Sequence, residues 1–384
     1  RLVAEAISAR ERLDASLFDL FCEKQMLSSF VAALLAPSVP SAAKVQMLQT
    51  MSMLLQNAQR ETSFYYLISG GQLSQLCSGD FAFADDELTT WFVTFLKSVA
   101  LRLNGESARL FVGPEGNLAL FDRAAALTRH ADPLVRASAR TAVLSLMRLD
   151  DPHVCSAVVA AASRSLVPGV TRGLREAWSE ATLAQRSGDS GALRKALEAE
   201  DDLVGFVGDV LDLNAAQVSE TITRHFLAVG LRPLLAGLAR RGPSPSGDGD
   251  AASDTVAFHA TAACALSWGG HRSLVEPLAR LLLQPSLPRG IVVEQPNIEA
   301  ASSDGTSIGP LEEWTASFSS SSKGPRVAAR EAEEQVANPF RAALLAPFGR
   351  ERDNDSLVSL DSRGSGARAL ASWLLAVLRR AQGL

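Results

Sequence analysis

The apolar residues between positions 85 and 104 recur with the period of an α-helix, and this pattern limits the possible fold most. The residues that share one helix face are Leu88, Trp91, Phe92, Phe95, Leu96, Val99 and Leu103. Asp85 is a suitable N-cap, and Asp86 and Glu87 place negative charge at the positive end of the helix. We therefore predict a long amphipathic helix with Trp91 and Phe95 in the core.

Further helices are predicted on both sides of this one. Residues 43–58 carry two overlapping apolar rows, so this helix is expected to be covered on more than one side. Another begins at Thr62 or Ser63 and ends near Gly70, and a third follows Asp132, which precedes a proline. Helical pairs recur at roughly the 40-residue spacing of armadillo and HEAT repeats. We predict an all-α fold, an armadillo/HEAT-like α-solenoid with disordered insertions.

Four sequence blocks resemble one family and keep its order. They are FDLFCEKQM at 18–26, QNAQRETSFYYL at 56–67, FAFADDEL at 81–88 together with FLKSVALRLN at 95–104, and HADPLVR at 130–136 with its continuation to Thr141. These blocks resemble the FPL-domain family, which contains endosome-maturation and autophagy proteins of the Ema and C-type-lectin-family-16 type. A plant relative acts in Golgi and vacuolar traffic. Weaker similarity continues at 209–214 and 338–340.

The resemblance implies a non-enzymatic scaffold or adaptor in endosomal-lysosomal or Golgi-vacuolar membrane traffic and autophagy. Its expected partners are proteins of the endosomal and autophagy machinery. The expected location is cytoplasmic, peripheral on late endosomes, lysosomes or Golgi membranes, through indirect association. The family has also been linked to ubiquitin ligase activity, so one alternative is a component of a ligase assembly. A generic armadillo-type adaptor is the other.

The composition fits this interpretation. The 384 residues are 47% hydrophobic, enough for a sizeable core, and the formal net charge of -5 argues against nucleic acid as a partner. No apolar run is expected to reach the ~20 residues that cross a bilayer. The chain begins with Arg1 and not with methionine, so we expect a fragment of a longer protein.

We divide the chain into four parts. Residues 1–155 form the FPL domain, and 156–284 continue as helices with a flexible loop at 242–254. Residues 285–337 form a disordered linker rich in serine, glycine, glutamate and proline. A last helical segment covers 338–384 and is expected to begin a further region.

No catalytic motif is found in the chain. There is no P-loop, nucleophile elbow, HExxH or GxGxxG, and every predicted element is helical. The four cysteines lack CxxC spacing, so we expect reduced, buried thiols: Cys22, Cys77, Cys155 and Cys264. The histidines are expected at helix ends or in the core, since His259 and Cys264 do not share a helix face. We predict no cofactor, no metal and no small-molecule substrate.

The candidate partner surface comes from the blocks that resemble the family. Its residues are Arg60, Tyr65, Tyr66, Arg102, Arg136 and Arg140. For the adjacent tyrosines, packing is the competing explanation, with one ring in the core and one outside. Arg136 and Arg140 share a helix face and either pair with an acid of the adjacent repeat or form, with Arg102 and Arg109, a basic ladder for an acidic partner segment.

Overall fold

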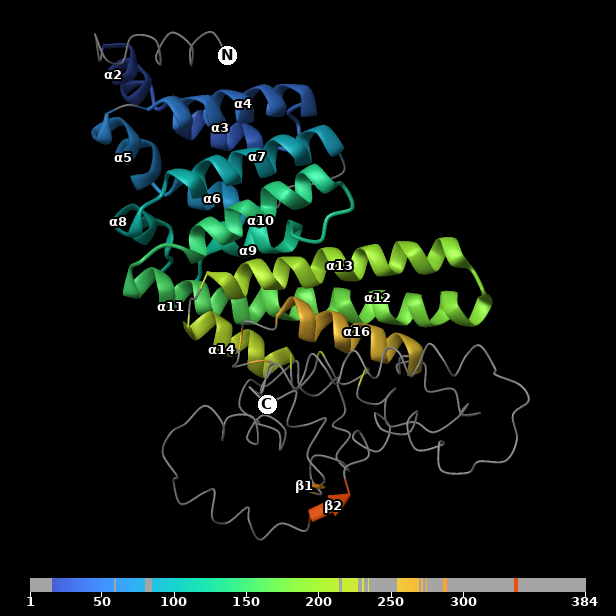
Figure 1. The fold of residues 1–384 in the computed structure, drawn as a ribbon. Coiled ribbons are helices and arrows are strands. Elements are labelled where there is room, and N and C mark those ends of the chain that lie inside the picture. Colours follow the sequence, from blue (N-terminus) through green and yellow to red (C-terminus); the bar gives the residue numbers. More distant parts are fainter. Residues whose placement is uncertain are drawn as a thin grey trace, which may run out of the picture. The chain divides into compact units, whose positions relative to one another are not determined.

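Stacked α-helices make up the first part of the chain in a computed structural model (Figure 1). The structure describes residues 16–58, 60–79, 85–213, 216–226, 230, 234, 254–268, 271, 274, 286–288 and 335–337. The chain divides into two units, Arg1–Gly169 and Val170–Leu384. The domain boundary that we predict near residue 155 lies within the first of these units and stays a prediction.

The helices of the first unit follow one another in sets of three. The first helices of the sets are α2 (Ser16–Glu23), α5 (Glu61–Ser69), α8 (Gly105–Ala108) and α11 (Pro152–Ala161). The second helices are α3 (Met26–Leu35), α6 (Gln72–Ser78) and α9 (Ala119–Leu127). The third helices are α4 (Ser41–Asn57), α7 (Asp86–Arg102) and α10 (Pro133–Met147). A 3-10 turn, η1 (Arg109–Phe111), follows α8.

The second helices of successive sets lie side by side, and so do the third helices. α4 packs on α7 and α7 on α10, while α3 packs on α6 and α6 on α9 (Figure 1). The third helices begin at Ser41, Asp86 and Pro133, a period of about 45 residues, which lies within the range of HEAT and armadillo repeats. The predicted all-α, solenoid-like fold is therefore confirmed.

The central helix α7 is covered on most of its circumference. Phe92, Phe95 and Leu96 are fully buried, as the sequence pattern predicted. Trp91 is only half-buried, so its assignment to the core was wrong. Val93 is buried as well, so the covered arc of α7 is centred near Phe92, and Trp91 lies towards its edge.

Local signals place the ends of the helices correctly. Asp85 accepts from the main-chain N–H groups of Glu87 and Leu88 at 2.9 and 3.2 Å. Asp132 caps α10 in the same way. Gly71 has a φ of 73° after α5, in the left-handed region that favours glycine. α4 has buried residues on two sides, as its two apolar rows predicted.

A continuous helical stretch runs over Pro152–Ser187 and contains a π-helical turn, η2 (Ala162–Leu166). By length and composition this stretch could cross a membrane, contrary to our expectation that no apolar run is long enough. Half of the most apolar 18-residue segment of this stretch is buried inside the fold. Core helices of soluble proteins pass the same test, so the finding is weak support for a membrane span.

The second unit is also built from helices. α12 (Val167–Ser187), within which the division falls, is followed by α13 (Ser190–Asp212), α14 (Ala216–His225) and α16 (Asp254–Ser267). α12 and α13 are joined at Gly188, whose φ of 75° allows a tight reversal. Asp189 then caps α13 by accepting from the N–H groups of Gly191 and Ala192. Trp178 and Trp268 are among the largest fully buried side chains.

Two short strands depart from our expectation that every element is helical. β1 (Ser286–Pro288) pairs antiparallel with β2 (Gln335–Ala337), with Leu287 opposite Val336. These strands fall at the two ends of the segment 285–337, whose predicted disorder otherwise lies outside the described residues. The predicted loop at 242–254 lies outside them too, apart from its last residue, which begins α16. The predicted helical segment 338–384 lies outside them entirely.

Candidate protein-binding face

Arg102, a candidate partner contact, binds the end of a neighbouring helix. Its Nη2 donates to Ala58 O at 2.8 Å and its Nη1 to Gln56 O at 3.4 Å. The guanidinium also lies 5.0 Å from the centre of the Phe64 ring. The last carbonyls of a helix lack a partner within it and carry partial negative charge. Arg102 therefore ties the end of α7 to the end of α4.

Arg136 and Arg140 hold the turn that follows α9. Arg136 Nη1 donates to His130 O at 2.8 Å and to Ala131 O at 3.2 Å. Arg140 Nε donates to Thr128 O at 3.2 Å. The two side chains share one face, as their spacing predicted, and the structure brings them together at this turn. Main-chain carbonyls of the same helical set are thus among their partners.

Two arginines with the same role were missed by the sequence analysis. Arg123 donates to Cys77 O and Gly79 O at the end of α6, and Arg129 Nη1 donates to Gly169 O at 3.1 Å. The acceptors of Arg123 lie 46 and 44 residues before it, the separations that also hold for Arg102. A repeated arginine about one period after a helix end is the signal that could have indicated Arg123. Arg129 does not follow this pattern, because its acceptor lies 40 residues later in the sequence.

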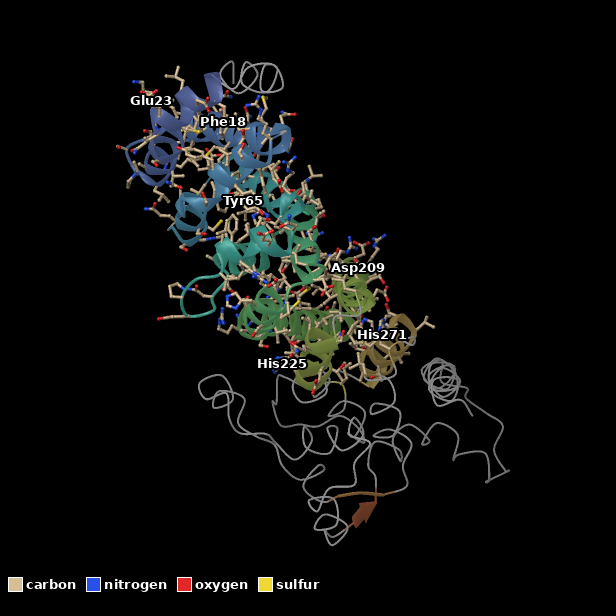
Figure 2. All side chains as sticks on the ribbon, turned by 90° about the vertical axis from the view of Figure 1, so that its left-hand side faces the viewer. Phe18, Glu23, Tyr65, Asp209, His225 and His271 are labelled. Carbon is tan, nitrogen blue, oxygen red and sulfur yellow. The ribbon has the colours of Figure 1, made fainter. Side chains whose placement is uncertain are left out.

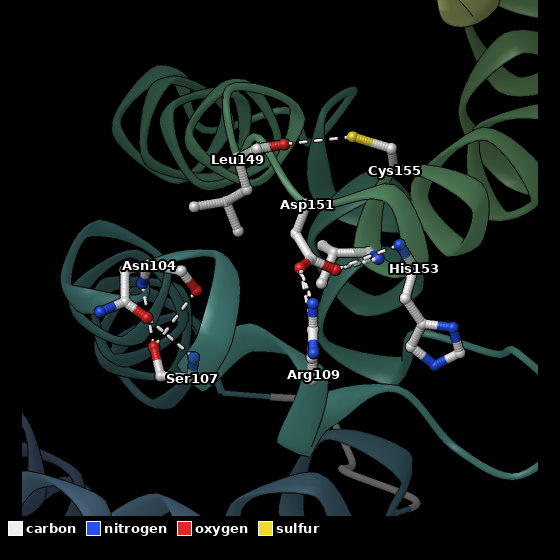
Figure 3. A network of polar contacts seen from close by, with 8 residues as sticks. Asn104, Ser107, Arg109, Leu149, Asp151, His153 and Cys155 are labelled. Atoms are coloured by element: carbon white, nitrogen blue, oxygen red, sulfur yellow. Dashed lines mark hydrogen bonds and ion pairs between the residues drawn. The ribbon is translucent and has the colours of Figure 1, made fainter.

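Arg109 is paired with a carboxylate of the next set. Its Nε donates to Asp151 Oδ2 at 2.9 Å, and Nη2 donates to the same oxygen (Figure 3). The other carboxylate oxygen accepts from the N–H groups of His153 and Val154, which caps α11. The hydrogen bond from Arg109 lowers the pKa of Asp151 below its ordinary value. This residue of the predicted basic ladder therefore already has an acid partner.

The neighbouring Cys155 and Asn104 complete the polar network of Figure 3. Cys155 Sγ donates to Leu149 O at 3.2 Å. Asn104 Oδ1 accepts from the N–H of Ser107 at 2.8 Å, and Ser107 Oγ accepts from the N–H of Asn104 at 2.9 Å. Each contact satisfies main-chain groups at a helix end. The network accounts for the local chain geometry without any reactive group.

The remaining candidates lie on or beside α5, on the side of the unit that faces the viewer in Figure 2. Tyr66 is 37% exposed, and its hydroxyl donates to Cys22 O at 3.1 Å. Tyr65 is half-buried, and burial together with Glu106 raises its pKa. Arg60 precedes α5 and is exposed. Neither tyrosine is a fully buried core residue, so both rings are in part accessible to solvent on this side.

Cys77 and Cys264 are buried, as the sequence predicted, whereas Cys22 and Cys155 are only half-buried, so that part of the prediction was wrong. Three of the thiols have raised pKa values. Burial raises the pKa of Cys77 to about 12, raises that of Cys264 well above its ordinary value, and raises that of Cys22. A catalytic thiol needs a lowered pKa, so that the thiolate is present near neutral pH. Among the described residues, no three His, Cys, Asp or Glu side chains gather where they could hold a metal ion.

A buried carboxylate connects three helices of the second unit. Glu200 on α13 is 2% exposed, and its Oε1 accepts from Trp178 Nε1 on α12 at 3.0 Å. Its Oε2 lies 3.5 Å from His259 Nδ1 on α16. This contact with Glu200 raises the pKa of His259, against the opposing effect of burial. His271 adds a second pair, with Nε2 at 3.0 Å from Asp212 Oδ1.

Sets of three stacked helices, with arginine side chains at the helix ends, define an armadillo/HEAT-like α-solenoid. Residues 1–147 match the model of the FPL family, described as an uncharacterised conserved protein, which confirms the resemblance found in the sequence. The match ends at Met147, the last residue of α10, so it includes the three sets of helices from α2 to α10.

Curated relatives are similar to part of this chain. The chain is 31% identical over 156 residues to Protein CLEC16A homolog of Drosophila melanogaster, covering 40% of this chain and 15% of that protein. It is 32% identical over 150 residues to Protein CLEC16A of Homo sapiens, covering 39% of this chain and 14% of that protein. With Protein TRANSPARENT TESTA 9 of Arabidopsis thaliana the identity is 27% over 246 residues, 61% of this chain and 29% of that protein. The chain spans less than a third of the length of these relatives.

Proposed function

We propose that this chain is a non-catalytic helical scaffold that acts through protein partners in membrane traffic and autophagy. The observation that carries the proposal is the coincidence of the FPL match, residues 1–147, with a continuous stack of capped helices. Such a stack gives a long, rigid surface, which suits the holding of partners in a fixed arrangement. The trafficking context rests on the resemblance to the FPL family.

The proposed location is cytoplasmic, on late endosomes, lysosomes or Golgi membranes, and peripheral through partners. Within the partner surface, Arg60, Tyr65 and Tyr66 are the contacts that we favour, because they lie exposed or half-exposed at α5. Arg102, Arg136 and Arg140 remain candidates, but they also hold main-chain carbonyls. Charge reversal at these three positions would therefore remove structural hydrogen bonds, and it is expected to lower the stability of the chain as well as the recruitment of partners.

Affinity purification of the tagged chain from cells, with quantification of the proteins that copurify, tests the proposal. We expect proteins of endosomal, lysosomal, Golgi or autophagy membranes to be enriched. Substitution Arg60→Glu should reduce that enrichment, whereas Lys195→Glu, the same charge change on an exposed position of α13, should not. Thermal unfolding of both variants checks that they are folded.

Two outcomes would contradict the proposal. One is enrichment of proteins from unrelated compartments only. The other is ubiquitin transfer by the purified chain in a reconstituted reaction that is lost on substitution of a single cysteine while the chain stays folded. The raised pKa values of Cys22, Cys77 and Cys264 make us expect no such transfer.

A further inference from the structure

Charge is unevenly distributed over the helices of the first unit. The third helices α4, α7 and α10 carry only two carboxylates, Asp86 and Glu87, both in the first turn of α7. Their basic residues are Lys44, Lys97, Arg102, Arg136 and Arg140. By contrast, α2, α5 and α8 each have an acid in the first turn. Beyond the start of α7, the stack of third helices is free of negative charge.

The outward side of this stack carries amides and hydroxyls around one lysine, together with two exposed leucines, Leu101 and Leu134. We call it the acid-free face, and its defining residues are Gln46, Gln56, Thr94, Lys97, Ser138 and Thr141. All six are exposed or half-buried. Two hydrogen bonds connect neighbouring helices along it: Gln56 Nε2 donates to Ser98 Oγ at 2.8 Å, and Lys97 Nζ donates to Ser138 Oγ at 3.4 Å. α4, α7 and α10 thus form one surface (Figure 1).

The ammonium group of Lys97 has unused capacity to bind an anion. It is half-buried and carries three donors, and the long contact to a neutral hydroxyl engages only one of them. Among the described residues, no carboxylate forms an ion pair with it. A partly desolvated cation without a counter-ion attracts a carboxylate more strongly than a fully hydrated surface lysine does.

The groups around Lys97 match the main chain of an extended peptide. Glutamine amides both donate and accept, as peptide groups do. The hydroxyls of Thr94 and Thr141 donate to carbonyls of their own helices at 2.8 Å, which leaves their oxygens as acceptors for N–H groups. Packed helices lie about 8 to 10 Å apart, so the three helices span ~20 Å. An extended segment of about six residues covers that distance.

We propose that the acid-free face binds an extended, acidic segment of a partner protein, with a carboxylate of that segment at Lys97. This inference rests on the proposed scaffold function and identifies the chemistry of one partner. An anionic membrane fits less well, since lipid surfaces are recognised by clusters of about four to eight basic residues. The outward stripe of α7 has a single lysine, with two threonines before it and the exposed Leu101 after it.

Fluorescence anisotropy with a labelled peptide of ten alternating glutamate and serine residues tests the proposal on the whole chain. We expect binding that weakens as salt is raised from about 0.05 to 0.15 M. Lys97→Glu should weaken it about tenfold or more, because the substitution replaces attraction by repulsion. Thr141→Trp, at an exposed position on α10, should also weaken it by obstruction. Lys195→Glu is the matched control and should change the affinity less than twofold.

Several outcomes would overturn the inference. The acidic peptide could fail to bind, it could bind equally well to Lys97→Glu and Lys195→Glu, or the corresponding lysine-serine peptide could bind as tightly. Binding of phosphatidylserine-containing vesicles that is lost with Lys97→Glu, without peptide binding, would assign the face to membranes instead. If Lys97→Glu does not fold, Thr141→Trp decides the question.

The copurification experiment separates this inference from the proposed function. Enrichment of trafficking proteins without peptide binding would refute the acid-free face and leave the scaffold function standing. Peptide binding at Lys97 without enrichment of such proteins would support the face and refute the trafficking role.

Discussion

In the unit Arg1–Gly169, arginine side chains donate to main-chain carbonyls at the ends of other helices, as Arg102 and Arg123 do. In the unit that begins at Val170, a buried carboxylate is the acceptor instead: Trp178 and His259 both contact Glu200. A main-chain carbonyl does not titrate and arginine stays charged, so the first arrangement does not respond to pH. A histidine-carboxylate pair does respond. The arginine–carbonyl contacts of the first unit are therefore expected to persist at pH values near 6.5, where the pair of His259 and Glu200 titrates.

The largest expected effect tests whether the repeat core supports this geometry. Phe95→Ala should lower the free energy of unfolding by roughly 3 to 5 kcal/mol, because Phe95 is fully buried on α7. Trp91→Ala is a matched control on the same helix and should cost less, since Trp91 is only half-buried. Urea unfolding measures both. Equal stability of wild type and Phe95→Ala would mean that this face of α7 does not form a core.

The next effect compares a charged with a neutral acceptor in the second unit. Trp178→Phe should cost about 2 to 3 kcal/mol, because it removes a donor to the buried carboxylate of Glu200. Trp268→Phe removes the same kind of donor from Val204 O, 3.0 Å away, and should cost about 1 kcal/mol. Both tryptophans are 1% exposed, so the loss of volume is matched. Denaturant titration that shows equal costs would contradict a special role of Glu200.

A smaller effect is expected at the arginine that joins α7 to α4. Arg102→Ala should cost about 1 to 2 kcal/mol, because the end of α4 loses two charge-assisted hydrogen bonds. Arg102→Lys should restore only part of this, since an ammonium lacks the planar fork of donors. Thermal unfolding of both variants at pH 5.5 and pH 8 provides the comparison. A cost that changes with pH would refute the pH-independent character of this contact.

The smallest effect is the pH response of His259. Its pKa is raised in the folded state, so its stabilising contribution is fully present below the ordinary histidine pKa near 6.5 and is lost as pH rises through the folded value. His259→Gln should therefore destabilise the chain more at pH 5.5 than at pH 8. Urea unfolding across this range measures the difference.

The titration of His225 changes the free energy of unfolding in the opposite direction to that of His259, so the two effects have to be measured separately. Burial lowers its pKa, so folding is disfavoured as pH falls below about 6.5. His225→Gln should reduce the acid sensitivity of the chain, which makes it the matched control. A destabilisation by His259→Gln that is larger at pH 8 than at pH 5.5 would show that the pair with Glu200 has no net stabilising effect.

The fold could largely be predicted from the sequence, because helix signals are local. The caps at Asp85, Asp132 and Asp151 act on N–H groups two or three residues away, and each marks a helix start in the structure. The spacing of apolar residues likewise identified the buried face of α7. It failed at Trp91 because periodicity gives the direction of a side chain and not the extent to which neighbouring helices cover it.

The candidate site could be predicted only in part. The sequence correctly placed Arg136 and Arg140 on one helix face, but the partners of Arg102 and Arg123 lie 44 or 46 residues earlier. Those partners are main-chain carbonyls, which every residue possesses, so no residue type indicates them. The sequence likewise could not predict that Lys97 keeps donors available, because this depends on which side chains of α4 and α10 lie near its ammonium group.

The sequence by itself determined the helices, their ends and the family resemblance of residues 1–147, since these depend on contacts within one or two turns. The tertiary structure alone decided which arginines hold helix ends, which lysine lies in a surface without acids, and that Glu200 is buried between Trp178 and His259. The physical reason is that burial and electrostatic partners are properties of packed surfaces from distant parts of the chain, which the order of residues does not display.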